Sequence, residues 1–215
     1  MKTPFTTEQF FLVFENYNLK VFPVQLFIVI LGVATLLLIH LKNRYKNRLI
    51  GCYLGLLWIW TGLVYHIVFF SAINKDAYVF GGIFILQGIL IFINTFNQRL
   101  IFTFTPQSKD YAGYFLILFG LIIYPIIGIA AEGTLVRTIT LGLPCPSTIF
   151  TFGLFLLTMN KFPKYLLIIP SLWAIVGLSA AINFGVVQDY MIIISAIIAD
   201  IILLRRNALT TGIYA

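Results

Sequence analysis

The sequence predicts an all-α integral membrane bundle of seven transmembrane helices, on the evidence of its composition, its hydropathy and the spacing of its apolar stretches. Hydrophobic residues make up 60% of the 215 residues and charged residues only 10%, and the mean hydropathy is +1.01. Such a chain lacks the polar surface that a soluble domain of this length needs. Apolar stretches close to the roughly 20 residues of a spanning helix recur along the chain. They cover residues 22–41, 49–72, 77–95, 111–131, 141–159, 163–184 and 190–204.

A single transmembrane domain is expected over residues 1–215, because the connections between the apolar stretches are short. Residues 21–206 would form the seven-helix bundle and residues 207–215 a short cytoplasmic tail. Short matches between the first three and the last three stretches suggest two three-helix repeats joined by the fourth helix, which resembles the plan of sugar-efflux and PQ-loop transporters. The matches are Pro23 and Gly32 with Pro144 and Gly153, Trp58 and Gly62 with Trp173 and Gly177, and Asp76 with Asp189. The Pro-Gln motif of those transporters is missing.

Residues 1–20 are predicted to form an amphipathic helix on the outer membrane interface. They do not form a signal peptide, because no basic start leads into an apolar core and Glu8 and Glu15 interrupt the pattern. The helix is expected to begin after Thr6 or Thr7. Its aromatic residues recur at helical spacing: Phe10, Phe11, Phe14 and Tyr17.

The basic residues predict the orientation, because Lys and Arg in short loops stay on the cytoplasmic side of a membrane. Ten of the 14 basic residues fall on one side of the predicted bundle. We therefore expect a bacterial inner-membrane protein with its amino terminus outside and its carboxyl terminus in the cytoplasm. The net charge of +7 then reflects contact with anionic lipid rather than a nucleic-acid partner. The ten residues are Lys42, Arg44, Lys46, Arg48, Arg99, Lys109, Lys161, Lys164, Arg205 and Arg206.

Residues 138–148, Thr-Ile-Thr-Leu-Gly-Leu-Pro-Cys-Pro-Ser-Thr, predict a break in the fifth apolar stretch. A helix that starts at Pro146 and ends near Asn160 rises only about 22 Å, whereas the hydrocarbon core is about 30 Å thick. Broken spans are where membrane proteins tend to place binding sites. The helix start could offer N–H groups to an anion, and the carbonyls before it could hold a cation. The alternative is a tight helix start that shapes the bundle and binds nothing.

Unusual polar chemistry gathers in the predicted outer half of the bundle. We expect ligand binding to depend above all on His66, Cys145, Thr148 and Asp189, because helix direction brings them to the same side although they are far apart in sequence. An organic or anionic ligand is preferred over a metal, since two soft ligands fall short of the usual three or four. The candidate ligand-binding residues are Tyr65, His66, Asn74, Gln87, Glu132, Cys145, Ser147, Thr148 and Asp189.

Structural roles compete with these functional ones. His66 could be a neutral, hydrogen-bonded residue that packs with the glycine face of its helix, and Gln87 and Asn94 could hydrogen-bond to a neighbouring helix. Asp200 could pair with the inner arginines or serve in a proton or cation relay. Two prolines each remove an intrahelical hydrogen bond and so free a carbonyl. They are Pro125, which frees that of Leu121, and Pro170, which frees that of Leu166.

Several more specific functions are disfavoured because the residues that they need are missing or too far apart. Neither a catalytic residue nor a metal or cofactor site is assigned. A retinal protein needs a lysine within a helix core, and none is present. His40 and His66 lie at opposite ends of the bundle and cannot share a haem iron, and Cys52 and Cys145 are likewise too far apart for a disulfide. An intramembrane hydrolase would need a hydroxyl next to His66, which remains a minor option.

A set of short motifs runs along the whole chain. These are Pro4-Phe5-Thr6, Gln9-Phe10, Tyr17-Asn18, Trp58-x-Trp60-x-Gly62 with Tyr65-His66 and Asn74, Gln87-Gly88, Tyr124-Pro125, Pro144 through Thr151, and Trp173 with Ser179-Ala180-Ala181. In this set the chain resembles a bacterial family of uncharacterised multi-pass membrane proteins, the domain of unknown function 6064. The resemblance implies an inner-membrane protein and no established activity, although some relatives carry permease-like labels.

The leading functional hypothesis is a permease or transporter for a small solute or ion, with its site near the break at residues 144–146. The rival is a non-transporting sensor or scaffold that binds a lipid or a protein partner in the same outer pocket. A polar cavity that reaches the middle of the membrane would favour transport, and a dry interior would favour the rival. The sequence leaves open the ligand and the oligomeric state.

Overall fold

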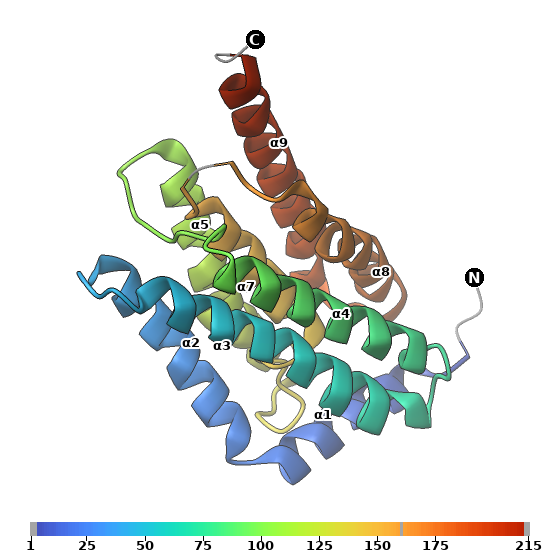
Figure 1. Ribbon diagram of the computed structural model, residues 1–215. Coiled ribbons are helices and arrows are strands. Elements are labelled where there is room, and N and C mark those ends of the chain that lie inside the picture. The colour runs from blue at the N-terminus through green and yellow to red at the C-terminus, as the bar shows by residue number, and fades with distance from the viewer. Residues whose placement is uncertain (1–3, 160, 213–215) are drawn as a thin grey trace.

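The computed structural model describes residues 4–159 and 161–212, and within them the fold is a bundle of helices packed around one central helix (Figure 1). Two isolated β-bridges are the only extended pairing in this part of the chain. The helices are α1 (Thr7–Val21), α2 (Val24–His40), α3 (Lys46–Trp60), α4 (Ala77–Phe96), α5 (Ser108–Leu118), α6 (Tyr124–Glu132), α7 (Pro144–Leu156), α8 (Ile168–Phe184) and α9 (Tyr190–Gly212). Shorter segments extend or join them: η1 (Thr61–Phe69) and η3 (Phe119–Ile123) are π-helical, and η2 (Phe70–Ala72), η4 (Lys164–Leu167) and η5 (Val187–Asp189) are 3₁₀-helical.

Seven spans are not confirmed. By length and composition, five helical segments of the described chain can cross a membrane, and α1 with α2 adds a sixth only if this pair, bent by 88°, counts as one span. The helix of the fifth apolar stretch, α7, has 13 residues and rises about 20 Å, which is less than the hydrocarbon thickness. The five segments are Lys46–Ala72, Ala77–Phe96, Ser108–Glu132, Lys164–Phe184 and Val187–Arg206.

The break before α7 is confirmed, although the predicted helix limits were wrong. The helix begins at Pro144 rather than Pro146 and ends at Leu156 rather than near Asn160, which lies outside the described residues. Proline fits the first turn because the N–H that it lacks has no helical partner there. Extended backbone at Leu143 leads into the helix.

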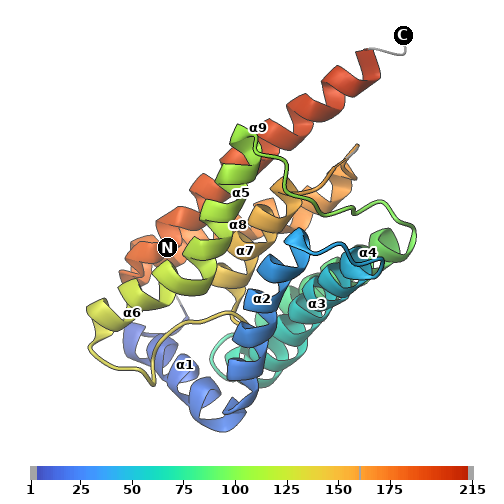
Figure 2. The ribbon, with the colours of Figure 1, turned by 90° about the vertical axis from the view of Figure 1, so that its left-hand side faces the viewer.

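Helix α7 is the core of the molecule. All of its 13 residues are buried, so the neighbouring helices shield it on every side (Figure 2). Glycines allow the closest approaches: a Cβ on Gly153 would lie 2.7 Å from the backbone oxygen of Gly113 on α5, and one on Gly120 would lie 2.8 Å from that of Pro146. Small residues at such crossings are typical of packing within membranes.

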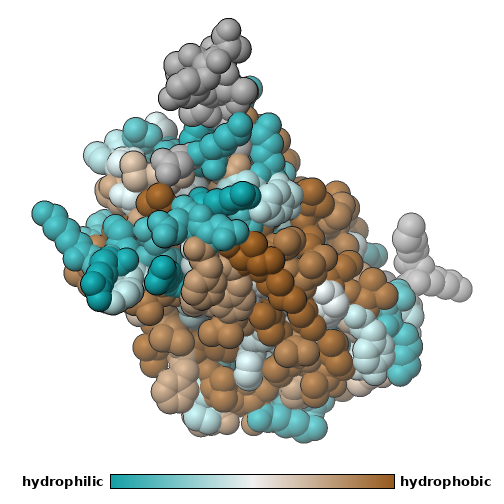
Figure 3. Space-filling view, viewed as in Figure 1, coloured by the Kyte–Doolittle hydropathy of each residue, from teal (hydrophilic) through white to brown (hydrophobic). Residues whose placement is uncertain are grey.

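The outer surface has the polarity of a membrane protein. Many leucine and isoleucine side chains on α2, α4, α8 and α9 are exposed, and they form a hydrophobic region between hydrophilic ends (Figure 3). A contiguous apolar surface of this kind marks a region that water does not cover. We name the end of the bundle where α1 lies the α1 end. The opposite end, with the loop between α2 and α3, is the basic end.

Helix α1 crosses the α1 end nearly at right angles to α2 (Figure 2). It begins after Thr6, as expected, in a capping box in which the Thr6 side chain accepts from the Gln9 N–H and the Gln9 side chain accepts from the Thr6 N–H. Its aromatic face does not lie free at the interface but is buried against the bundle, with Phe14 stacked on Tyr65 of η1 at 5.7 Å.

The last helix is longer than its apolar stretch. The predicted tail begins at residue 207, and α9 continues through it to Gly212. Asp200 forms no ion pair with the arginines among the described side chains, and its carboxylate accepts a hydrogen bond of 2.8 Å from the Ser171 hydroxyl on α8 instead. Ser171 comes within reach because α8 packs along α9.

Candidate functional site

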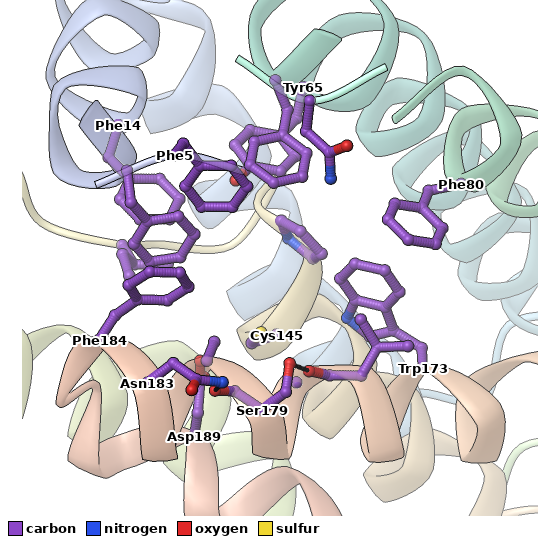
Figure 4. Close-up of a pocket in the computed structure, with 18 of the residues that line it drawn as sticks. Phe5, Phe14, Tyr65, Phe80, Cys145, Trp173, Ser179, Asn183, Phe184 and Asp189 are labelled. Atoms are coloured by element: carbon purple, nitrogen blue, oxygen red, sulfur yellow. Dashed lines mark hydrogen bonds between the residues drawn. The ribbon is translucent and has the colours of Figure 1, made fainter. Parts of the chain in front are cut away.

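A cavity of about 410 Å³ opens at the α1 end, between α1, the start of α4 and the second half of α8 (Figure 4). We name it the aromatic pocket. Phe5, Phe14 and Phe184 lie on one side of it, Phe80 and Trp173 on the other, and Cys145 and Asp189 beneath (Figure 4). The remaining lining residues are Pro4, Phe10, Tyr65, Phe70, Asn74, Asp76, Tyr124, Ile139, Pro144, Val176, Gly177, Ser179, Ala180 and Asn183.

The walls are held rigid by ring contacts between segments that are distant in sequence. Phe10 of α1 stacks on Phe184 of α8 with ring centroids 4.4 Å apart, and Phe5 stacks on the same ring at 5.4 Å. Tyr65 stacks on Phe70 at 5.6 Å. Offset-stacked and edge-on pairs of this kind add to the burial of each ring. The amino-terminal segment is therefore a wall of the pocket rather than a separate anchor.

The floor carries a buried carboxyl group. Asp189 is 2% exposed, and its Oδ1 accepts a hydrogen bond from the Tyr124 hydroxyl. The Cys145 thiol lies beside the same carboxyl, next to Tyr124 and Trp173. No basic side chain in the described chain forms an ion pair with Asp189. A carboxyl group inside a membrane protein without a counter-charge is costly and marks a functional site by default.

Local chain geometry brings these floor residues together. Gly185 adopts a φ of +73°, which lets the chain leave α8 and turn back into η5, where Asp189 ends the segment. Tyr124 follows the π-helical segment η3, and Cys145 is the second residue of α7. Gly177 lets α8 pack closely on α9, because a Cβ there would lie 3.1 Å from the Ile192 side chain, and the Cys145 sulfur would be in contact with it at 3.5 Å.

Two buried polar rings lie next to the floor. The indole N–H of Trp173 has no oxygen or nitrogen partner in the described chain, and it faces the side of Cys145, whose thiol lies next to it (Figure 4). His66 is completely buried beside the pocket, and neither ring nitrogen has a hydrogen-bond partner in the described chain. It is caged by aromatic rings instead, with Phe84 at 4.6 Å and Trp173 at 5.0 Å. For the structural alternative, the packing of His66 is therefore seen, but a hydrogen bond within the described residues is not.

The structure brings four of the nine candidate residues to the pocket lining: Tyr65, Asn74, Cys145 and Asp189. Ser147 and Thr148 lie within α7 and make structural bonds, from the Gly142 N–H to Ser147 Oγ at 3.0 Å and from the Thr148 hydroxyl to the Pro144 carbonyl at 2.8 Å. An anion site on the α7 amino terminus finds few donors, because Pro144 and Pro146 have no N–H and the Ser147 N–H bonds to Leu143.

Gln87 and Glu132 lie away from the pocket. The Gln87 amide donates a hydrogen bond of 2.9 Å to the carbonyl of Leu166, which agrees with the structural alternative for this residue. Glu132 ends α6 and lines a small separate cavity with Arg137 and Gln188. His66, the ninth candidate, lies behind the wall that Trp173 and Phe80 form.

Sequence reasoning missed most of the pocket. Tyr124, Trp173 and the phenylalanine walls were not candidates, because aromatic residues in an apolar stretch read as lipid-facing or packing residues. The available signal was the pairing of Tyr124-Pro125 and Trp173 with the other family-like motifs. Phe5 belongs to the same motif set, but its contact with Phe184 depends on how α1 packs against the bundle, which the sequence does not show.

Comparison with known proteins identifies a family but no individual similar protein. The model of a family of unknown function, DUF6064, matches residues 7–214. No curated protein and no solved structure matches the chain.

Proposed function

The chain belongs to the DUF6064 family of unknown function, and from the geometry of the aromatic pocket we propose that it binds a small organic solute within the membrane. One observation carries the proposal: a cavity of about 410 Å³ combines aromatic walls with a buried carboxyl at its floor. Ligand sites in proteins typically have volumes of about 300–1,000 Å³, apolar linings and a few convergent polar groups.

Two π-helical segments border the pocket and support a functional role. Segment η1 supplies Tyr65 to the lining, and η3 ends directly before Tyr124. Such segments interrupt an otherwise regular helix at a cost and are frequent at functional sites. Their placement around this one cavity favours a site that is more than a packing defect.

Binding without transport is the preferred role, in contrast to the transporter that the sequence favoured. Transport needs a route toward the basic end, and below the pocket the bundle is packed. Trp58 of α3 packs against α7, where its indole N–H donates a hydrogen bond of 2.9 Å to Thr151. Its ring also contacts Phe84, with ring centroids 4.5 Å apart. This packed interior favours a sensor or receptor, because such a protein binds its solute without a route across the membrane.

Transport is the second candidate, and the π-helical segments are the observation that favours it. They give α3 and α5 irregular turns at the level of the pocket, where a helix bends most readily. Flux of a bound solute into proteoliposomes, measured beside its binding, separates the two roles. Binding with flux establishes the transporter, and binding without flux establishes the sensor.

We also propose that the protein lies in the bacterial inner membrane with the α1 end outside, supported by the basic residues at the opposite end. A single cysteine placed at Asn43, in a chain whose Cys52 and Cys145 are replaced by serine, tests this orientation. Only membrane-permeant thiol reagents should label it in intact cells. Labelling by an impermeant reagent from outside would overturn the orientation.

Binding at this pocket is tested by filling it. Purified protein is screened against a diverse set of small solutes, and a bound solute raises the melting temperature with its concentration. Ala180 lines the pocket, so Ala180→Phe should abolish this stabilisation. Ile182, on the same helix, is 65% exposed and lies outside the lining, so Ile182→Phe is the matched control and should keep it. Equal responses in both variants would reject the pocket.

A further inference from the structure

The aromatic pocket has a charge that contrasts with the rest of the protein. The whole chain carries a net charge of +7, yet the pocket lining contains two aspartates, Asp76 at the rim and Asp189 at the floor, and no lysine, arginine or histidine. A cavity lined by carboxyl groups and by no basic side chain favours positive ligands over negative ones.

Two basic residues at this end, Arg137 and Lys75, have other partners. Arg137 forms ion pairs with Glu8 at 2.7 Å and with Glu15 at 3.0 Å. The Lys75 ammonium lies over the ring of Tyr78, 6.0 Å from its centroid. Neither side chain lines the pocket, so the carboxyl of Asp189 receives no counter-charge from them.

The walls present aromatic rings, which a cation prefers. Phe80 and Trp173 lie on one side of the space above Asp189, opposite the stacked phenylalanines of α1 and α8 (Figure 4). The negative face of an aromatic ring attracts a cation, most strongly for tryptophan, and the attraction grows when water is excluded. A carboxylate combined with an aromatic cage is too apolar for a hydrated inorganic ion but suits an alkylated ammonium group.

On the premise of the proposed function, we infer that the ligand of the aromatic pocket is an organic cation whose ammonium group pairs with Asp189 beside the rings of Phe80 and Trp173. This chemistry has two sources in a membrane: a free solute such as choline, and the amine headgroup of a phospholipid. The two share the ammonium group and differ in the acyl chains.

Choline and tetramethylammonium are the probes, and 3,3-dimethylbutanol is the uncharged analogue of choline with the same shape. Binding is measured by isothermal titration to purified protein in nanodiscs that contain only phosphatidylglycerol. Choline should bind at least about tenfold more tightly than the alcohol, because the alcohol lacks the charge. Equal affinity for the two compounds would overturn the cation while leaving the pocket as a binding site.

Two pairs of variants locate the interaction. Asp189→Asn should weaken choline binding about tenfold or more, whereas Asp76→Asn at the exposed rim should change it only slightly. Trp173→Phe keeps an aromatic face and should retain binding, whereas Trp173→Leu should lose it. Because Asp189→Asn could perturb folding, its size-exclusion profile and melting temperature are compared with those of the parent. A folded Asp189→Asn protein with parental choline affinity would overturn the inference.

A second nanodisc series distinguishes the source of the cation. In phosphatidylethanolamine nanodiscs, a lipid headgroup that fills the pocket should compete with choline and lower its apparent affinity, and Asp189→Asn should remove the competition. Unchanged choline affinity identifies a free solute as the ligand. If no ammonium probe binds but an uncharged solute from the diverse set stabilises the protein through Ala180, the inference fails and the proposed function stands. If nothing in the set binds, the proposed function itself fails.

Discussion

The side-chain amide of Gln87 on α4 donates a hydrogen bond of 2.9 Å to the backbone carbonyl of Leu166, which lies in η4 directly before α8. Pro170 lies four residues further along and has no N–H to offer this carbonyl. A buried carbonyl without a donor is costly in an apolar interior. The Gln87 amide therefore replaces the hydrogen-bond donor that Pro170 lacks. The same two segments are joined again two turns further along α4, where the Tyr165 hydroxyl donates to Asn94 at 2.7 Å.

This relationship predicts a coupled pair of substitutions. Gln87→Leu should lower the free energy of unfolding by about 1 kcal/mol, because it leaves the Leu166 carbonyl without a donor. In a Pro170→Ala background the alanine N–H can take over, so the same substitution should cost clearly less. Reversible unfolding in mixed micelles measures all four proteins of this cycle. Additive effects of the two substitutions would show that Gln87 and Pro170 act independently.

Close packing between α3 and α4 predicts a contrast between two glycines of α4. A Cβ on Gly88 would lie 2.6 Å from the backbone oxygen of Gly55, whereas one on Gly82 would meet nothing within 4 Å. Gly88→Ala should therefore destabilise the protein by about 1–3 kcal/mol through overpacking. Gly82→Ala should be neutral or slightly stabilising, because alanine favours helix. A melting temperature for Gly88→Ala equal to that of Gly82→Ala would contradict the close crossing.

Acid should loosen the contact between α1 and the loop before α7. Hydrogen bonds from Arg137 hold the pKa of Glu8, an exposed residue of the first turn of α1, below its ordinary value of 4.5. A lowered pKa in the folded state means that the pairing stabilises the protein above about pH 4.5 and is lost as the pH falls further. Glu8→Gln should thus lower the melting temperature slightly at pH 7 and not at pH 3. A difference that persists unchanged at pH 3 would exclude this ion pair as its cause.

The sequence was sufficient for the class of fold and for the break in the fifth apolar stretch, because both depend on local composition and on proline chemistry. It also led to the capped helix that begins after Thr6 and to the carbonyl freed by Pro170. Asp189 and Cys145 were predicted as site residues because polar groups are rare in these helices, and both line the pocket.

The number of spans and most of the pocket could not be read from the sequence. The 88° bend between α1 and α2 and the burial of α7 depend on tertiary packing that hydropathy does not encode. Ser147 and Thr148 do not line the pocket, and their hydroxyl groups bond to backbone groups close by in the chain. The proposed three-helix repeats stay a prediction.

The central claim is that the aromatic pocket binds a small solute over Asp189. An experimental structure in nanodiscs, determined with the strongest hit of the solute screen at saturating concentration, tests it most directly. The account predicts density for the solute between Phe184, Phe80 and the Asp189 carboxyl. Density for the solute elsewhere, with this cavity closed by the side chains of its own walls, would contradict it.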